Sequence, residues 1–395
     1  MEQQPDIINE KEAKKNVRTF AAASFFNDMG SDMIYPIWPL FLTEVLGANM
    51  AVLGLVDGLG DALVSISQAV SGYISDRIRR RKVFVWIGYF FGGLSRIGYA
   101  LAGTWQHIIP FRILDRAGKM RGAPRDAMIA DESTQANRGS RFGLLRTMDN
   151  LGSVLGVLFT IAFLGLLGYR KIFWLAAIPS IIAVILVMFI IKERKAPESK
   201  IFKGFSLKFL QRDFKLFLSL NAVFALGAFS YSFLLILAKN HGYRDVTIPI
   251  LYLVFSAVAS IFSLPFGRLA DKIGRKKVML IAFLLWAVVC LGAIFFTSIW
   301  IIPVIFVLYG LHRGALEPVQ KTLASELAPV DYRASSLGAF QLITGFAALP
   351  ASLGAGLLWV RFGDTIPFVV SLGLTVVAGL LLLFIRENNE LIIKE

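Results

Sequence analysis

The side chains best suited to chemistry in this chain are acids and bases that interrupt long hydrophobic stretches. Ionisable groups at membrane depth are energetically costly, so they are candidates for function by default. The first half of the chain carries seven acids and seven bases of this kind: Asp28, Asp32, Asp57, Asp61, Arg96, Arg112, Asp115, Arg116, Lys119, Arg121, Arg125, Asp126, Arg146 and Asp149. The second half offers mainly His312, Arg313 and Glu317.

The spacing of the aspartates points to proton chemistry. Asp28 and Asp32 are one helical turn apart and share a helix face, and Asp57 and Asp61 repeat that spacing. Burial favours a neutral carboxyl group and a neighbouring cation favours the carboxylate, so such a group takes up and releases protons as its surroundings alternate. Asp32 falls near the middle of the membrane at about 1.5 Å per residue. It is the first candidate, ahead of Asp61 and Asp149.

The predicted site is therefore a proton-coupling and substrate cavity without catalytic or metal-binding residues. Its members are Asp28, Asp32, Asp61, Arg112, Asp115, Arg116, Lys119, Arg146, Asp149 and Glu317. The alternative for each residue is a structural ion-pair network, because buried charges are stable only when they are paired. The sequence has no phosphate-binding loop, no metal-spaced histidines or cysteines and no catalytic triad, so we expect no cofactor and no enzyme.

These side chains need membrane helices to position them. Of the 395 residues, 56% are hydrophobic and 17% charged, and the mean hydropathy is +0.65, which excludes a set of soluble domains. Spans of roughly 20 apolar residues predict an all-α protein with twelve transmembrane helices. They lie near 18–46, 51–75, 83–103, 107–131, 139–166, 171–191, 213–239, 246–270, 278–298, 300–327, 334–360 and 365–385. The polar N-terminus lacks the pattern of a signal peptide.

The basic residues predict the orientation of these spans. The net charge of +14 gathers in alternate loops, such as the RIRRRK run at 77–82, while LGANM and GTWQ carry no basic residue. By the positive-inside rule, both termini and the basic loops are cytoplasmic. We therefore expect a multi-pass protein of the bacterial plasma membrane, in contact with lipid and monomeric, and no nucleic-acid partner.

The chain also repeats itself at an offset of 195 residues. Residues 72–82 (GYISDRIRRRK) align with residues 267–277 (GRLADKIGRKK), and at the same offset Asp131 meets Glu326. This predicts two six-helix halves, 18–191 and 213–385, joined by a cytoplasmic linker at 192–212. Residues 1–17 and 386–395 form cytoplasmic tails. Paired repeats of this kind commonly house a central site and work by rocking.

The repeated segment resembles the signature G-x-x-x-D-R/K-x-G-R-R/K of the major facilitator superfamily, and the resemblance covers essentially the whole chain. It implies twelve helices in two pseudo-symmetric halves and a transport function. The matching residues are Gly72, Asp76, Arg77, Arg80, Gly267, Asp271, Lys272, Gly274 and Arg275. In that role each aspartate makes a charge-assisted contact at the cytoplasmic mouth that breaks on opening. Arg79 replaces the usual glycine, which puts the turn geometry of the first copy in doubt.

Two further segments resemble subgroups of that family. The run from Arg112 to Gly118 is similar to the R-x-x-Q-G-x-G pattern of proton-coupled members, and Arg112 matches the arginine tied to coupling. Gly152 and Gly156 resemble the start of the antiporter signature, but Val157 stands where proline is usual. Ordinary packing of small residues between helices is the alternative for both glycines.

These features predict a secondary active transporter that moves a small solute by alternating access, through proton-coupled efflux of an amphipathic organic compound. An alternative is proton-coupled uptake or exchange of an organic anion, for which Arg112, Arg116 and Lys119 are suited. Divalent-metal transport through Asp28 and Asp32 is a minor alternative. A non-transporting receptor or scaffold on the same fold is the alternative from another class.

Overall fold

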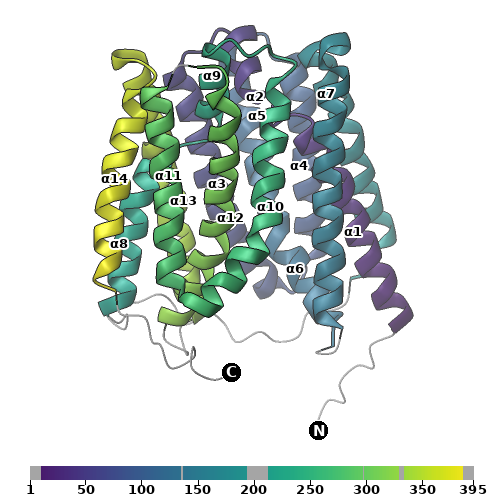
Figure 1. Ribbon diagram of the computed structural model, residues 1–395. Coiled ribbons are helices and arrows are strands. Elements are labelled where there is room, and N and C mark those ends of the chain that lie inside the picture. The colour runs from purple at the N-terminus through teal and green to yellow at the C-terminus, as the bar shows by residue number, and fades with distance from the viewer. Residues whose placement is uncertain (1–9, 135–136, 194–211, 297, 329–332, 386–395) are drawn as a thin grey trace. The chain divides into compact units, whose positions relative to one another are not determined.

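The fold was taken from a computed structural model that describes residues 10–134, 137–193, 212–296, 298–328 and 333–385 (Figure 1). Every regular element in these ranges is helical, so the all-α prediction is confirmed. Most of the predicted linker at 192–212 and the predicted tail at 386–395 lie outside the described residues. Helix α1 begins at Glu10, so the last part of the predicted N-terminal tail is helical.

The chain packs into two compact units. The first contains residues 1–35 and 66–201, and the second contains residues 36–65 and 202–395. The helix α3 (Met50–Ile78) begins in the second unit and ends in the first. The predicted halves divide the chain differently, because residues 36–65 pack with the second half of the sequence. The division into 18–191 and 213–385 therefore stays a prediction.

The helices of the first unit follow in sequence order: α1 (Glu10–Asp32), α4 (Lys82–Leu101), α5 (Trp105–Ala117), the 3-10 turn η2 (Gly118–Arg121), α6 (Gly122–Asp131), α7 (Arg138–Ile185) and the π turn η3 (Leu186–Ile190). The helix α7 is two helices joined at Gly168, whose φ of 70° and ψ of 173° are not helical. Glycine tolerates this conformation. The break lies between the predicted spans 139–166 and 171–191.

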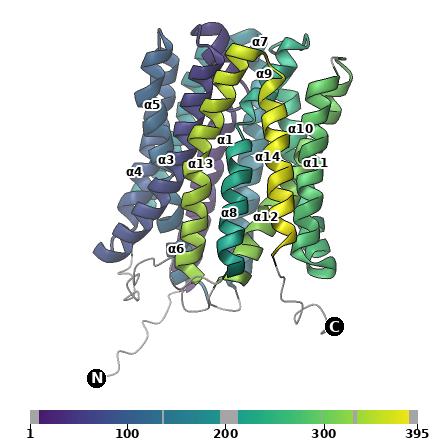
Figure 2. The ribbon, with the colours of Figure 1, turned by 90° about the vertical axis from the view of Figure 1, so that its left-hand side faces the viewer.

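The second unit contains α2 (Trp38–Leu40), the π turn η1 (Phe41–Val45), α8 (Arg212–Gly227), α9 (Ser232–Asn240), α10 (Ile248–Ile273), α11 (Arg275–Phe295), α12 (Ile301–Leu327), α13 (Arg333–Phe362) and α14 (Ile366–Leu383). Within it, α12 packs against α10 and α11, and α8 packs against α13 and α14 (Figures 1 and 2). Stacked aromatic side chains fill part of this packing: Phe224 lies 4.6 Å from Phe283 and 6.0 Å from His312, measured between ring centroids.

Seven helical segments of the described chain are long and apolar enough to cross a membrane. One of them is the kinked run Arg138–Ile190, which covers two predicted spans. The other predicted spans are also helical, but α1, α5 and α12 carry charged residues that lower their hydropathy. The multi-pass membrane character is therefore supported, and the count of twelve crossings stays a prediction.

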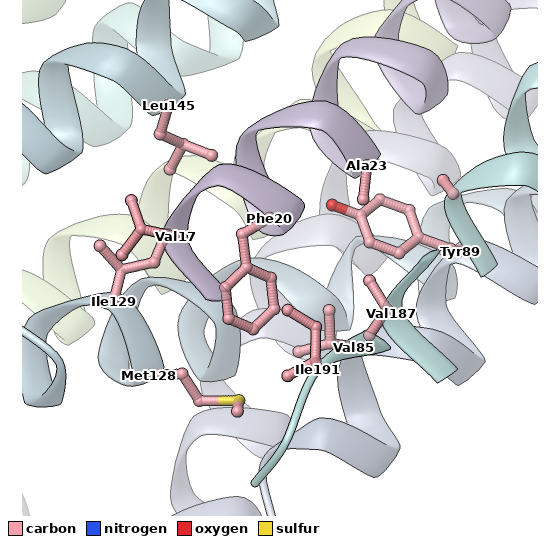
Figure 3. Packing of buried hydrophobic residues seen from close by; sticks show 11 residues of the cluster. Val17, Phe20, Ala23, Val85, Tyr89, Met128, Ile129, Leu145, Val187 and Ile191 are labelled. Atoms are coloured by element: carbon pink, nitrogen blue, oxygen red, sulfur yellow. The ribbon is translucent and has the colours of Figure 1, made fainter. Parts of the chain in front are cut away.

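The core of the first unit is built on α1. Its residues Val17 and Phe20 contact hydrophobic side chains of α4, α6, α7 and the segment after α7 (Figure 3). Phe20 is fully buried, and Val85, Tyr89 and Met128 belong to the same cluster. Burial of one such side chain contributes roughly 1.5–3 kcal/mol. This packing fixes α1 in register against the helices that carry the charges.

Two predicted helices are interrupted at corresponding places. The predicted span 18–46 ends as a helix at Asp32, and the predicted span 213–239 ends at Gly227, which is 195 residues further on. Residues 33–37 and 228–231 are not α-helical in either case. Pro36 explains the first break, because proline lacks an amide donor and restricts the residue before it. Both predicted spans therefore contain a short non-helical segment, although Arg212–Asn240 as a whole is still long and apolar enough to cross a membrane.

Candidate functional site

The end of α1 that precedes the first break is held by a buried arginine. Arg96 of α4 donates hydrogen bonds to the carbonyl oxygen of Ala176 at 2.9 Å, to the carbonyl oxygen of Asn27 at 3.1 Å and to the hydroxyl of Ser31 at 2.8 Å. It also donates to the hydroxyl of Ser180. All of these acceptors are neutral. Arg96 therefore ties α1 and α7 to α4 without a hydrogen-bonded carboxylate.

Helices α1 and α7 meet backbone to backbone. A Cβ atom on Gly152 would meet the carbonyl oxygen of Phe25, and one on Gly156 would meet that of Met29. Small residues allow this approach between membrane helices. Helix packing thus explains the two glycines of the antiporter-like segment, and an antiporter role for them stays a prediction.

Two cations face the break that follows α1. The hydroxyl of Thr160 donates to the carbonyl oxygen of Met33 at 2.7 Å, which anchors the non-helical residues to α7. The guanidinium of Arg116 lies 5.1 Å from the centroid of the Tyr35 ring, and the ammonium of Lys119 lies 6.0 Å from the same centroid. Cations at such distances are attracted by the face of an aromatic ring. The break therefore presents an aromatic ring beside two positive charges.

Next to this break, α5 contributes buried charges. Asp115 lies 3.6 Å from Arg116, measured between Oδ2 and Nε, and both side chains are about nine-tenths buried. Arg112 is buried one turn before Arg116. Asp32, the last residue of α1, is half-buried. The structure thus places four of the predicted cavity residues in the first unit, and the coupling of Asp32 to Arg112 stays a prediction.

A second group of charges joins α1, α6 and α7. Arg125 contacts Asp126 at 2.9 Å, donates to the hydroxyl of Ser24 at 2.7 Å and lies 3.9 Å from Asp149. Arg146 contacts the other oxygen of Asp149 at 3.3 Å. Charge-assisted contacts of this kind are the stronger hydrogen bonds of proteins. Two predicted cavity residues, Arg146 and Asp149, therefore belong to one ion-pair network, and Arg125 lies at its centre.

Asp28 takes part in weaker contacts one turn before Asp32. Its carboxylate accepts a hydrogen bond from the side chain of Asn27 at 3.0 Å and lies 3.9 Å from Arg121. Arg121 in turn lies 4.9 Å from the centroid of the Tyr89 ring. The sequence reasoning named Arg121 and Arg125 among the buried charges but did not place them in the cavity.

At the end of the first unit that carries the signature, one arginine joins two acids. Arg81 contacts Asp76 at 2.6 Å and also pairs with Asp131. The side chain of Arg81 is 8% exposed, whereas Arg77 and Arg80 are exposed. Arg81 thus makes the contact predicted for Asp76, and the site prediction, which included Arg77 and Arg80, had missed it.

The second copy builds the same arrangement from the neighbouring position. Arg275 contacts Asp271 at 3.0 Å and Glu326 at 3.0 Å. At the offset of 195, Arg275 aligns with Arg80, although its contacts correspond to those of Arg81. In both units an arginine therefore bridges the signature aspartate and the acid at the end of a later helix, but the arginine differs by one position in the alignment.

The lysines that follow Arg81 and Arg275 also make corresponding contacts from positions that differ by one in the alignment. The ammonium of Lys82 donates to the carbonyl oxygen of Ile191 at 2.7 Å, and that of Lys276 donates to the carbonyl oxygen of Leu383 at 2.7 Å. Both satisfy carbonyl groups near the end of a helical run, where helices leave acceptors free. The helix α4 begins at Lys82 and α11 at Arg275. The second copy thus starts its helix earlier in the alignment.

The turn residues before these helices share a left-handed backbone. Gly274 has a φ of 101° and Arg79, which aligns with it, has a φ of 56°. Arg79 is the single non-glycine residue with positive φ in the described part of the chain. An L-residue in this left-handed region is strained by about 1–2 kcal/mol. The first copy therefore keeps the left-handed turn although it lacks the glycine. Arg79 adopts the strained conformation in its place.

The strain at Arg79 gives a paired prediction. Arg79→Gly and Arg79→Ala remove the same side chain, but only glycine adopts the positive φ without a Cβ penalty. We expect Arg79→Gly to be more stable to unfolding than Arg79→Ala by about 1 kcal/mol. Thermal unfolding of both purified variants in detergent tests the difference. Equal midpoints would show that the turn relaxes.

The two signature glycines differ in their surroundings. A Cβ atom on Gly72 would lie 3.4 Å from the Cβ atom of Ala123, whereas nothing lies within 4 Å of one on Gly267. Lys272 is exposed. A Cβ atom on Gly72 would make an ordinary van der Waals contact, so a close approach to a neighbouring helix requires neither glycine.

Adjacent arginines allow a matched test of the bridge. Arg81→Ala should lower the transport rate about tenfold or more, because coupling energies of roughly 1–3 kcal/mol are ordinary for conformational switches. Arg80→Ala removes an exposed side chain and should transport at close to the wild-type rate. In the second unit Arg275→Ala should behave as Arg81→Ala does. Transport rates measured in proteoliposomes at equal protein content show whether Arg81, or Arg80 as the alignment suggests, corresponds to Arg275. A loss of rate in Arg80→Ala rather than in Arg81→Ala would contradict the role of Arg81.

The second break surrounds a carboxylate that the site prediction had left out. Asp57 accepts hydrogen bonds from the indole of Trp38 at 2.9 Å, from the hydroxyl of Ser230 at 2.8 Å and from the hydroxyl of Ser232. It is 2% exposed. The amide of Ser230 donates to the hydroxyl of Ser352 at 3.2 Å. The pairing of Asp57 with Asp61 in the sequence was the signal that pointed to it.

The remaining predicted cavity residues lie in the second unit. Glu317 pairs with Arg313 on α12, and both side chains are about half exposed. Asp61 lies on the part of α3 that belongs to this unit and interacts electrostatically with Arg313. The predicted set is thus divided: Asp61 and Glu317 lie in one unit and the other eight residues in the other.

Comparisons with known proteins bear on the whole chain. Residues 20–243 and 216–392 match the family model described as the Major Facilitator Superfamily. A transporter of this type from Methanocaldococcus jannaschii is 37% identical over 387 residues, which cover 95% of this chain and 96% of that protein. The multidrug resistance protein MdtG of Salmonella paratyphi C is 25% identical over 333 residues, which cover 78% of this chain and 80% of that protein.

A solved structure supports the fold. The crystal structure of a mutant of the nucleoside transporter NupG matches 94% of this chain and 100% of its own chain with a TM-score of 0.78. The two sequences are 13% identical. At that identity the likeness concerns the arrangement of helices alone.

Proposed function

The chain belongs to the Major Facilitator Superfamily, and from that premise we propose that it is a proton-coupled secondary transporter that exports an amphipathic organic compound. It works by alternating access, in which a solute site opens to one side of the membrane at a time. No cofactor takes part. The proposal concerns the coupling ion, the direction and the solute class, which the family by itself does not specify.

The observation that carries the proposal is the pair of breaks at Asp32 and Gly227. Non-helical backbone at membrane depth is tolerated where it is buried in protein or lines a cavity. Interrupted helices at corresponding positions of two repeats are typical of the substrate site of secondary transporters. The first break carries Asp32 and faces Arg116 and Lys119 across Tyr35. These groups supply the charge that proton coupling needs.

Export is favoured by one relative. The protein MdtG is named a multidrug resistance protein, and its similarity extends over about three quarters of this chain.

The orientation follows from the basic loops. We expect both termini and the signature segments to face the cytoplasm of a bacterial cell. Single cysteines at 47–50 and 104–106 should react with a membrane-impermeant maleimide in intact cells, and single cysteines at 78–82 should react only after the cells are opened. Cys290 is buried, so its background reaction is low. Labelling of 78–82 from outside would contradict the orientation.

Flux measurements test the function directly. Purified protein is reconstituted into proteoliposomes, and accumulation of fluorescent amphipathic dyes is recorded with and without an imposed proton gradient. We expect accumulation that scales with the gradient and collapses when a protonophore is added. A receptor or scaffold would give no flux above protein-free liposomes. Flux that does not depend on the proton gradient would contradict proton coupling but would still support a transport function.

A further inference from the structure

The candidate charges of the first half are equal in number of acids and bases along the sequence, but they are not equal within the first unit of the structure. The candidate charges at membrane depth that the sequence analysis named in the first half are seven acids and seven bases. Two of the acids, Asp57 and Asp61, lie in residues 36–65, which pack into the second unit. The first unit therefore retains seven cations and five carboxylates at these positions. Uncompensated charge at membrane depth is costly, so an excess of two positive charges calls for an explanation.

The carboxylates of the first unit are already engaged by some of these cations. Asp149 contacts Arg146 and lies near Arg125, while Asp126 contacts Arg125. Asp115 lies 3.6 Å from Arg116. Asp28 lies 3.9 Å from Arg121, so four of the five acids lie within 4.0 Å of a cation of this group. The remaining cations therefore compete for few negative partners.

Like Arg96, whose hydrogen-bond acceptors are all neutral, Lys119 has no carboxylate in direct contact among the described residues. Its ammonium faces the ring of Tyr35, and no carboxylate oxygen among the described residues lies within 4.0 Å of it. Its side chain is half-buried, on the 3-10 turn η2 between α5 and α6. Arg116 lies on the same aromatic ring, 5.1 Å from its centroid. Two positive groups and one aromatic face thus meet at the break that follows α1.

We infer that the transported compound is an amphipathic organic anion whose carboxylate, sulfonate or phosphate binds between Lys119 and Arg116. A planar part of the compound stacks against Tyr35. Cationic side chains bind such anions through charge-assisted hydrogen bonds, and binding cancels the excess charge of the unit. This inference rests on the proposed function and names the solute class for the same site.

A matched pair of dyes tests the inference by binding rather than by flux. Fluorescein is anionic and a cationic rhodamine has the same xanthene rings, so the two differ chiefly in charge. Fluorescence anisotropy with the full-length protein in detergent gives the dissociation constant of each. We expect saturable binding of fluorescein, and weaker binding of the rhodamine by roughly tenfold or more, as one charge-assisted contact implies.

Variants at Lys119 assign the contact. Lys119→Gln should weaken fluorescein binding by roughly tenfold or more, and Lys119→Arg should restore it, since the charge is kept. Lys171→Gln, which removes an exposed lysine on α7, is the matched control and should bind as the wild type does. Phosphatidylglycerol added in excess should not displace fluorescein; displacement would assign the site to a lipid headgroup and overturn the solute assignment.

Several other results would contradict the inference or separate it from the proposed function. Equal or tighter binding of the rhodamine, absence of saturable fluorescein binding, or full affinity in Lys119→Gln each overturn the inference. Gradient-driven flux of the rhodamine alone would overturn the anion assignment and leave the proposed transport function in place. Conversely, Lys119-dependent binding of fluorescein without proton-driven flux would keep the anion site and overturn the coupling.

Discussion

The variant Gly156→Leu should fail to yield stable folded protein. A Cβ atom at this position would meet the carbonyl oxygen of Met29, so a leucine forces α7 away from α1. Overpacking ordinarily costs about 1–3 kcal/mol, and here the obstacle is backbone, which cannot rotate aside. Because the hydrophobic cluster around Phe20 depends on α1 lying in this groove, the loss spreads through the first unit. Monodisperse yield after gel filtration and the thermal midpoint measure the effect.

Gly143→Leu provides the control on the same helix. Nothing lies within 4 Å of a Cβ atom on Gly143, and the residue is exposed. The substitution should therefore leave the thermal midpoint close to that of the wild type. Equal destabilisation by both substitutions would show that a general effect of leucine on α7, rather than contact with α1, decides stability.

Most of the helical framework could be predicted from the sequence, because hydropathy and length carry that information locally. The break at Gly168 agrees with the predicted gap between two spans. The breaks after Asp32 and Gly227 were missed, since apolar residues continue through both and hydropathy does not register a change of backbone. Pro36 was a local signal for the first break. The second break has no matching proline, but it lies at the same place in the repeat of 195 residues.

The contacts of the signature could be predicted only in part. The sequence identified Asp76 and Asp271 and paired Asp131 with Glu326 by offset. It could not tell Arg81 from Arg80, because the choice depends on where the following helix begins. That starting point is a feature of the folded backbone, which an alignment does not show.

The charge balance of the candidate site depends on packing between distant segments. Along the sequence, Asp57 belongs with the other charges of the first half. In the structure its carboxylate accepts hydrogen bonds from Ser230 and Ser232, more than 170 positions away along the chain. Periodicity places a residue on a helix face but does not say which helix that face meets. The excess of positive charge around Lys119 was therefore not predictable from composition.

Asp32→Asn is expected to abolish proton-driven accumulation while solute binding persists. Asp32 ends α1, and the preceding turn is fixed by Arg96 through Asn27 and Ser31. Asparagine has nearly the same size and still forms hydrogen bonds, but it cannot take up or release a proton. A carboxylate that is charged in one state and neutral in another is what links the gradient to movement.

The measurements separate coupling from folding. Accumulation of dye in proteoliposomes under a proton gradient should fall to the level seen without a gradient, whereas gradient-free exchange and equilibrium binding remain. Asp28→Asn, one turn earlier on the same helix face, is the matched comparison and should retain accumulation, because Asp28 contacts Asn27 and Arg121 rather than the break. Full proton-driven transport in Asp32→Asn would move the assignment to Asp61 or Asp149. Loss of folding in that variant would instead make Asp32 a structural ion-pair partner, since removal of one charge from a buried pair is strongly destabilising.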